Sequence, residues 1–355
     1  MRSRFGDVTG DCIQAEKTAD ALHEIGQDAD RYYLDAKTGK VYGKENELLG
    51  EWVDVMESMD VIHSIPPIPS KNIIRLPRVR ALLVTSTVFW SSPNYWKVIL
   101  RNSVKIDVNL LKALIREFAA KVGIKLLNAK NGYDLLLANS EDEIRCVRKY
   151  CRLKVGAKLS AVPNAIDPIP EWVSSLPRYD ELPSEDYILV PGYFAERKNQ
   201  KSLIMALKDF NYSVVFMGRG PLFEKCRQIA SPNMIFLGHV EHQSRLFYSA
   251  LKFARIVCLP SNCETPGIAG LEAAALGVRP VVPYEGGTCQ YYGWDAEYIN
   301  PLSQSSIRDA VERAWTRGRL RVDEADRYRR RTWSECAQRT LKAYGDIIKS
   351  MGLYA

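Results

Sequence analysis

The chain has little histidine and no long apolar run. Four of its 355 residues are histidine, and its eight cysteines include no Cys-x-x-Cys pair or zinc-type spacing. A metal centre therefore has little support, and reduced structural thiols are the simplest interpretation of the cysteines. No apolar stretch is long enough to span a bilayer and no secretory signal is visible, so we expect a cytoplasmic protein.

Internal repeats and low-complexity tracts are also lacking. A length of 355 residues exceeds what one hydrophobic core usually supports, which favours two domains. Strand-like apolar runs alternate with helical patterns along the chain, and this alternation is typical of parallel α/β sheets. The stretch 168–186 (PIPEWVSSLPRYDELPSED) is rich in proline, serine and acids, which indicates a domain junction.

Two glutamates stand eight positions apart in the segment 260–277 (PSNCETPGIAGLEAAALG). The apolar run before them (ARIVCLP) has the length of a buried parallel strand, so Glu264 falls in the loop at its carboxyl end. Glu272 follows in a small, alanine-rich helix. Because ligands of open α/β sheets bind at these strand ends, both glutamates are candidates for one site. The alternative is an ordinary strand and helix with surface acids.

A second strand and turn lie upstream, in residues 187–199 (YILVPGYFAERKN). Lys198 stands where the following helix begins, and a cation beside the N–H groups of a helix start suits a diphosphate. Glycine turns also follow apolar runs in residues 214–221 (VVFMGRGP), 233–240 (NMIFLGHV) and 277–288 (GVRPVVPYEGGT). The Gly286-Gly287 pair lets backbone amides approach a ligand closely.

In this order the segments resemble those of the GT-B glycosyltransferases, in particular the retaining glycosyltransferase family 4 with its Glu-x7-Glu motif. The resemblance implies catalytic roles for Lys198 at the diphosphate and Glu264 at the donor sugar. Tyr193 departs from the family, which has arginine after the first glycine, and Arg197 or Arg219 is the candidate replacement. The donor-binding residues implied are Glu272 at the ribose, Arg197, Gly218, Arg219, Val240, Pro266, Gly267, Ile268, Gly286, Gly287 and Thr288.

The resemblance implies an α/β protein with the GT-B fold, in which two Rossmann-like domains face a cleft. We expect an acceptor-side domain in residues 1–172, a linker in 173–186, a nucleotide-sugar domain in 187–332 and a helix in 333–355 that crosses back to the first domain. The segment 158–167 (KLSAVPNAID) resembles the family's first-domain end. Residues 1–4 make a poor buried strand, so the first strand is either missing or short and polar.

The implied activity is transfer of a sugar, with retention of configuration, from a nucleotide-diphosphate sugar to a glycan or a lipid-linked acceptor. It needs neither a metal nor a cofactor, and UDP, GDP and ADP donors all stay open. Two alternatives remain. One is a catalytically inactive nucleotide-sugar-binding relative, favoured by Tyr193, and the other is a GT-B sugar-nucleotide epimerase, which would need further carboxylates or histidines in the cleft.

Charge is unevenly distributed in the first half of the chain. Residues 71–130 hold twelve Lys and Arg against two acids, whereas the first sixty residues hold seven basic and fourteen acidic residues. The basic stretch also carries Phe89, Trp90, Tyr95 and Trp96. Such a surface suits an anionic membrane, which predicts peripheral binding at the inner membrane face. A solvated basic face is the alternative, and nucleic acid is disfavoured because no nucleic-acid motif accompanies the charge.

Overall fold

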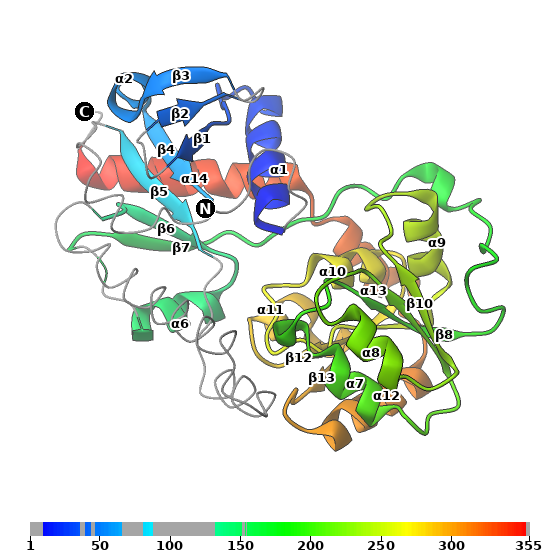
Figure 1. Ribbon diagram of the computed structural model, residues 1–355. Coiled ribbons are helices and arrows are strands. Elements are labelled where there is room, and N and C mark those ends of the chain that lie inside the picture. Colours follow the sequence, from blue (N-terminus) through cyan, green and yellow to red (C-terminus); the bar gives the residue numbers. More distant parts are fainter. Residues whose placement is uncertain are drawn as a thin grey trace. The chain divides into compact units, whose positions relative to one another are not determined.

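The computed structural model describes residues 10–35, 40–43, 47–65, 81–87, 132–150, 153 and 155–352 (Figure 1). The described chain forms two compact units. The first holds the described residues up to 165 together with 332–352, and the second holds 166–331. The question of the first strand concerns residues 1–9 and lies outside the described residues, as does the basic stretch 71–130 apart from 81–87.

The first unit contains a parallel and an antiparallel sheet. The parallel sheet has the order β4 (Val61–Ser64), β5 (Leu82–Ser86), β6 (Leu135–Ala138) and β7 (Lys158–Ala161). The antiparallel sheet has the order β1 (Tyr33–Asp35), β2 (Lys40–Tyr42) and β3 (Leu48–Glu51). The described helices of this unit are α1 (Gly10–Glu24), α2 (Trp52–Met56), α6 (Glu141–Tyr150) and α14 (Trp333–Met351).

The junction between β6 and α6 shows how a local sequence signal sets a helix start. The Ser140 hydroxyl accepts the backbone N–H of Glu143 at 3.1 Å, as an N-cap residue does. The buried Glu143 carboxylate in turn accepts the N–H of Asn139 at 2.8 Å and the hydroxyl of Thr87 at 2.8 Å. The capping pair therefore also ties the ends of β5 and β6 together.

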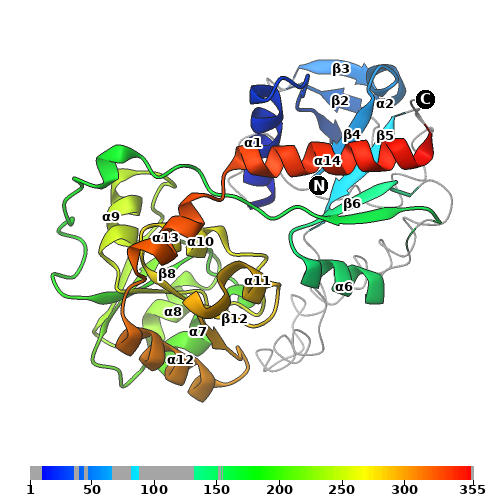
Figure 2. The ribbon, with the colours of Figure 1, turned by 180° about the vertical axis from the view of Figure 1, so that it is seen from behind.

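Helix α14 joins the first unit although it is last in the chain. Its apolar side, which includes Trp333, Ala337 and Tyr344, is buried with residues of α1 and β6 in one core cluster. Both ribbon views show α14, in red, alongside the parallel sheet of this unit (Figures 1 and 2). The Tyr344 hydroxyl also lies 2.7 Å from Nδ1 of His63 on β4. The predicted helix that crosses back to the first domain is thus present.

The second unit is built on a six-stranded parallel sheet. Its order is β10 (Met234–Gly238), β9 (Ser213–Met217), β8 (Tyr187–Pro191), β11 (Ile256–Cys258), β12 (Arg279–Pro283) and β13 (Glu297–Ile299). In chain order within the unit this is 3-2-1-4-5-6, the Rossmann arrangement. The order reverses between β8 and β11, so the loops after these strands diverge and leave a place for a ligand at the carboxyl ends.

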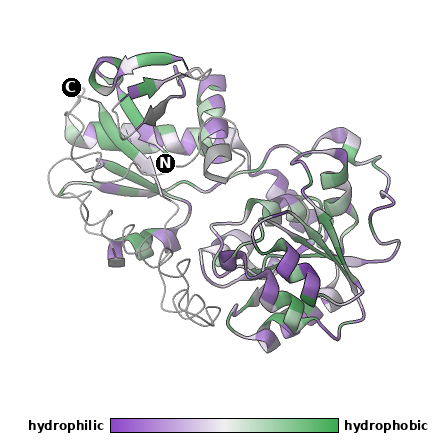
Figure 3. Cartoon of the chain, in the orientation of Figure 1, coloured by the Kyte–Doolittle hydropathy of each residue, from purple (hydrophilic) through white to green (hydrophobic). Residues whose placement is uncertain are grey.

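Side chains alternate between the two faces of this sheet. Ile188 and Val190 pack under α7, α8 and α12, whereas Tyr187 and Leu189 face α9 and α10. Both faces are covered, as in other parallel sheets, and the strands are predominantly hydrophobic in Figure 3. The α-helices of this unit are α7 (Gln200–Ala206), α8 (Phe223–Ile229), α9 (Arg245–Phe253), α10 (Ile268–Ala275), α11 (Thr288–Tyr292), α12 (Gln304–Arg317) and α13 (Val322–Arg329).

Short 3₁₀ helices complete the second unit, namely η1 (Glu171–Val173), η2 (Glu196–Lys198) and η3 (Gly293–Asp295). The predicted linker, residues 173–186, packs on this unit, where Val173, Leu176 and Leu182 join the core cluster beneath α9. These contacts order a segment that is polar and proline-rich in sequence.

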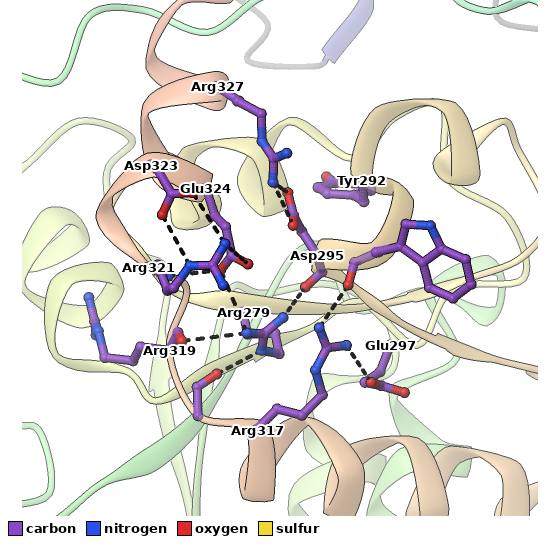
Figure 4. Close-up of polar contacts among 12 residues, drawn as sticks. Arg279, Tyr292, Asp295, Glu297, Arg317, Arg319, Arg321, Asp323, Glu324 and Arg327 are labelled. Atoms are coloured by element: carbon purple, nitrogen blue, oxygen red, sulfur yellow. Dashed lines mark hydrogen bonds and ion pairs between the residues drawn. The ribbon is translucent and has the colours of Figure 1, made fainter.

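A polar network fastens α13 at the amino-terminal end of β12 (Figure 4). Arg279 is buried and donates to the carbonyls of Gly318 at 2.8 Å and Asp295 at 2.7 Å. The Asp295 carboxylate accepts from the Arg327 guanidinium at 2.7 and 2.8 Å and from the Tyr328 hydroxyl at 2.8 Å. The network lies at the opposite strand ends from the loops expected to bind a ligand, so its role is to hold the architecture.

Candidate active site

The two loops at the point where the strand order reverses bring Lys198 and Glu264 together. Lys198 ends η2 in the connection after β8, and Glu264 lies in the loop after β11. The ammonium Nζ lies 2.5 Å from Oε1 of the carboxylate. Both residues were predicted as catalytic, and their meeting is a contact between segments 66 positions apart.

The Glu264 carboxylate is buried, with 7% of its surface exposed. The Ser261 hydroxyl donates to the same oxygen at 2.5 Å. Burial alone raises the pKa of Glu264, but the charge and hydrogen bond of Lys198, the Ser261 hydrogen bond and the charge of Arg197 outweigh it and lower the pKa. Glu264 is therefore an anion at neutral pH, matched by an adjacent cation.

Hydrogen bonds to main-chain carbonyls hold these two loops together. Asn199 takes a left-handed conformation, with φ of 57°, and its side-chain amide donates to the carbonyls of Pro260 at 3.0 Å and Pro301 at 3.1 Å. The N–H of Asn262 donates to the carbonyl of Arg197 at 2.9 Å. Sequence reasoning did not single out Asn199 or Ser261, although both lie inside the motifs that it used. The role of Asn199 depends on partners 61 and 102 positions along the chain, whereas the partner of Ser261 is Glu264, three positions away.

Gly286 allows the loop after β12 to lie against the backbone of Glu264. Its φ is 109°, and a Cβ at this position would stand 1.9 Å from the Glu264 carbonyl oxygen. The N–H of Glu264 donates to the carbonyl of Glu285 at 3.1 Å. Gly267, at the start of α10, is similarly confined, since its Cβ would stand 3.3 Å from Oε2 of Glu264. A Cβ at Gly286 would therefore displace the backbone of Glu264, whereas one at Gly267 would first meet the Leu259 side chain, at 2.7 Å.

The remaining predicted residues after β11 and β12 differ in which of their groups are exposed. Gly287 has a φ of 86° and precedes α11, whereas the Thr288 hydroxyl is buried and donates to the carbonyl of Pro283. Thr288 therefore anchors its own turn rather than offering its hydroxyl. Pro266 follows Thr265 through a cis peptide bond, and Ile268 packs partly buried against a core cluster.

The loops after β9 and β10 hold Gly218, Arg219 and Val240. A Cβ on Gly218 would stand 2.1 Å from the Gly192 carbonyl oxygen, so these two glycine turns are in close contact. The exposed Arg219 guanidinium lies 4.9 Å from the centre of the Phe223 ring. Val240 packs against the cluster beneath α9. Of the two arginines that were candidates to replace the one expected at Tyr193, Arg197 is the one whose charge acts on Glu264.

Glu272 contacts His242, a residue that the sequence analysis did not predict as part of the site. Glu272 is buried on α10, and its Oε1 lies 2.7 Å from Nε2 of His242 in the loop after β10. Burial raises the pKa of Glu272 and Asp167 adds to the rise, while the hydrogen bond and charge of His242 oppose it without cancelling it. The position of His242 in the sequence could have identified it, because it follows Gly238 in a loop that was already predicted to bind a ligand.

Two features are absent from the described part of the chain. No group of three or more His, Cys, Asp and Glu side chains in it could hold a metal ion. No helix in it combines the length and the apolar character required to cross a membrane.

Residues 177–324 match a family model described as glycosyl transferases group 1. An uncharacterized glycosyltransferase of Methanocaldococcus jannaschii is 24% identical over 218 residues, which cover 59% of this chain and 60% of the relative. A second uncharacterized glycosyltransferase of that organism is 29% identical over 184 residues, 47% of either chain. The chain thus spans about half the length of the curated relatives it matches.

Solved structures resemble the chain over more of its length. WaaG, a glycosyltransferase involved in lipopolysaccharide biosynthesis, covers 99% of this chain with 97% of its own, at 15% identity and a TM-score of 0.61. HepE of Anabaena, in complex with UDP-glucose, covers 85% of this chain with 81% of its own, at 16% identity and a TM-score of 0.55. With the two α/β units described above, these likenesses confirm the predicted GT-B fold class.

Proposed function

We propose that the protein is a glycosyltransferase that takes its sugar from a nucleotide-diphosphate donor and retains the anomeric configuration. The family match lies within the second unit and includes both Lys198 and Glu264. The observation that carries the proposal is the ion pair between these residues, because it places a cation and a buried carboxylate where the order of a Rossmann sheet reverses.

In this proposal Lys198 binds the donor diphosphate. The charge that develops on the leaving diphosphate would be met by Lys198, by Arg197, by the start of α10 and by the amides of Gly286 and Gly287. Such preorganised electrostatic stabilisation acts at the step in which the sugar–phosphate bond breaks. It requires no metal and no cofactor besides the donor substrate itself.

Glu264 would orient the hydroxyls of the donor sugar, and Glu272 would bind the ribose. A diphosphate competes with Glu264 for Lys198, so donor binding would release the carboxylate to accept sugar hydroxyls. Retention without an enzyme nucleophile implies that the acceptor attacks from the face the leaving group vacates. Gly218, Arg219, Val240, Pro266, Gly267 and Ile268 would line the donor, and Thr288 would support the turn of Gly287.

For the acceptor we propose a glycan or a lipid-linked sugar at an anionic membrane surface. This part rests on the sequence alone, through the charge and the aromatic residues of 71–130. The protein would then act at the inner membrane face as a peripheral protein.

A thermal-shift screen of UDP, GDP, ADP and their sugar conjugates tests the donor proposal. A nucleotide that binds the folded state at a hundred times its Kd stabilises it by about 2.7 kcal/mol, so one base should raise the melting temperature clearly. Transfer or slow hydrolysis of the matching sugar donor then separates an enzyme from an inactive nucleotide-sugar-binding relative. No shift with any of the three nucleotides would contradict the proposed function.

A further inference from the structure

We propose that His242 is a positioning residue for the ribose-binding glutamate, and that it orients the Glu272 carboxylate for the nucleotide. This inference rests on the proposed function, because the ligand it serves is the donor nucleotide. His242 follows β10 and Glu272 follows β11, so the two residues come from opposite sides of the point where the strand order reverses.

The contact joins two loops of the sheet that lie apart in the chain. His242 belongs to residues 239–244, between β10 and α9, whereas Glu272 lies on α10 after β11. The carboxylate is 5% exposed and the imidazole 29% exposed, and their nearest atoms are 2.7 Å apart. The more exposed imidazole therefore holds the buried carboxylate through a contact with its Oε1.

The imidazole is itself held by its surroundings. The ring lies edge-on to Phe247, with centroids 4.9 Å apart and an interplanar angle of 76°. Its neighbour Gln243 has a left-handed backbone, with φ of 64°, and donates its side-chain amide to Asp167. On the other side, Ser244 caps α9 by accepting the N–H of Phe247 at 3.2 Å. These contacts set the ring before any ligand binds, which is what a positioning residue requires.

The charges around the pair explain why Glu272 needs such a partner. Burial and the charge of Asp167 both favour the protonated acid. The Tyr248 phenol on α9 also faces these two carboxylates; burial and their charges raise its pKa, and it offers no positive charge. His242 supplies the opposing hydrogen bond and charge. An ionised carboxylate is an acceptor at both oxygens and suits the two hydroxyls of a ribose, whereas a protonated one gives up part of this capacity to its own O–H. Removal of the imidazole should therefore weaken nucleotide binding, and more so at lower pH.

Calorimetric titration of UDP, GDP and ADP into wild type and variants at pH 8 and pH 6 tests the inference. For the nucleotide that binds, His242→Phe should weaken affinity about tenfold at pH 8 and further at pH 6. His242→Gln keeps an N–H donor and should stay within about threefold at pH 8. His23→Phe, at an exposed histidine of α1, is the control and should leave affinity unchanged.

A double-mutant cycle with Glu272→Ala separates positioning from a structural role. If His242 acts through the carboxylate, His242→Phe should cost no further affinity in the Glu272→Ala background. An equal loss in both backgrounds, or wild-type affinity for His242→Phe, would overturn the inference while leaving the donor proposal intact. A wild-type protein that binds none of the three nucleotides would instead overturn the proposed function, and the inference with it.

Discussion

Glu264 depends on Lys198 for its ionised state. The buried carboxylate stays an anion because the ammonium and the Ser261 hydroxyl both contact its Oε1. Removal of one partner from a buried ion pair costs more than the pair contributes, because the remaining charge is left without compensation. A single substitution at either position therefore changes the other residue as well, and experiments on this pair must account for both.

Lys198→Ala should weaken the binding of nucleoside diphosphates at least about tenfold and leave the binding of the corresponding nucleoside within about twofold. The reason is that the lost charge meets only the phosphates, and charge-assisted hydrogen bonds are the strong ones. Calorimetry with UDP and uridine, GDP and guanosine, and ADP and adenosine measures the two affinities.

Lys201→Ala, at an exposed lysine on the first turn of α7, is the matched control and should change neither affinity. The double variant Lys198→Ala, Glu264→Gln removes the uncompensated carboxylate and should recover stability but not diphosphate affinity. Equal diphosphate affinity in wild type and Lys198→Ala would remove Lys198 from the site.

At the scale of elements, the site depends on how closely loops pass one another. The loop after β12 touches the loop after β11 at Gly286, and the turn after β9 touches the turn after β8 at Gly218. In both places the first obstacle that a Cβ would meet is backbone, which cannot move as the end of a side chain can. The carboxyl-end loops of four strands thus form a single packed layer that presents Lys198 and Glu264.

Gly286→Ala should lower the free energy of unfolding of the second unit by about 2–4 kcal/mol. The left-handed backbone costs an alanine about 1–2 kcal/mol, and displacement of the Glu264 backbone adds to this cost. Donor turnover should fall more than stability explains, because the carboxylate moves with its backbone. Denaturant unfolding and a donor-hydrolysis assay measure the two effects.

Gly293→Ala is the matched control for the backbone cost. It also has a positive φ, of 52°, but a Cβ there would meet nothing within 4 Å. Its backbone, at φ 52° and ψ −127°, also disfavours alanine, so this variant should lose stability through the backbone alone and keep wild-type turnover. If the two alanine variants have the same turnover, the close approach of Gly286 to Glu264 does not contribute to activity.

At the scale of the whole molecule, a buried histidine makes the stability of the first unit sensitive to acid. In the first unit, Nε2 of His63 lies 2.9 Å from the Ser86 hydroxyl, and burial lowers the pKa of His63 to about 4. An unfolded chain titrates this histidine near its usual value of about 6.5. Between these values the unfolded state binds a proton that the folded state does not, so the first unit loses stability as the pH is lowered through this window.

The first unit should lose up to about 3 kcal/mol through His63 between pH 6.5 and pH 4, and no more from this group below pH 4. Hydrogen exchange of the β4 and β5 amides as a function of pH measures this unit separately. His63→Gln should flatten the profile in that window, and His239→Gln, at an exposed histidine, should leave it unchanged. A His63→Gln profile as steep as that of wild type would contradict the prediction.

The membrane prediction also belongs to the whole molecule. Vesicles that contain phosphatidylglycerol should bind the protein, whereas neutral vesicles should not, because residues 71–130 carry a large excess of positive charge. Sedimentation with vesicles should show weaker binding in salt, since the Debye length falls from about 10 Å at 0.1 M to about 3 Å at 1 M. Replacement of Lys97, Arg101 and Lys105 by glutamine should reduce binding and leave donor affinity unchanged. Equal binding to charged and neutral vesicles would contradict the membrane prediction and favour a solvated basic surface.

Much of the fold was predictable because its signals are local. Apolar runs at the corresponding positions predicted the strands from β8 to β12. The positions of Lys198 and Glu264 followed from the rule that ligands bind at the carboxyl ends of parallel strands. The predicted roles of these residues, like those of Glu272 and the glycines, remain predictions until donor binding is measured.

The sequence by itself determined which residues stand at the strand ends, because strand, turn and helix start are each encoded within a few neighbouring residues. Only the tertiary structure decided which of them meet. Lys198 contacts Glu264 and His242 contacts Glu272 across 66 and 30 positions, and no periodicity in the chain reports such distances. The charge state of a buried carboxylate follows from these contacts, since it depends on the balance between desolvation and a neighbouring cation. That balance exists only after the sheet has brought the loops together.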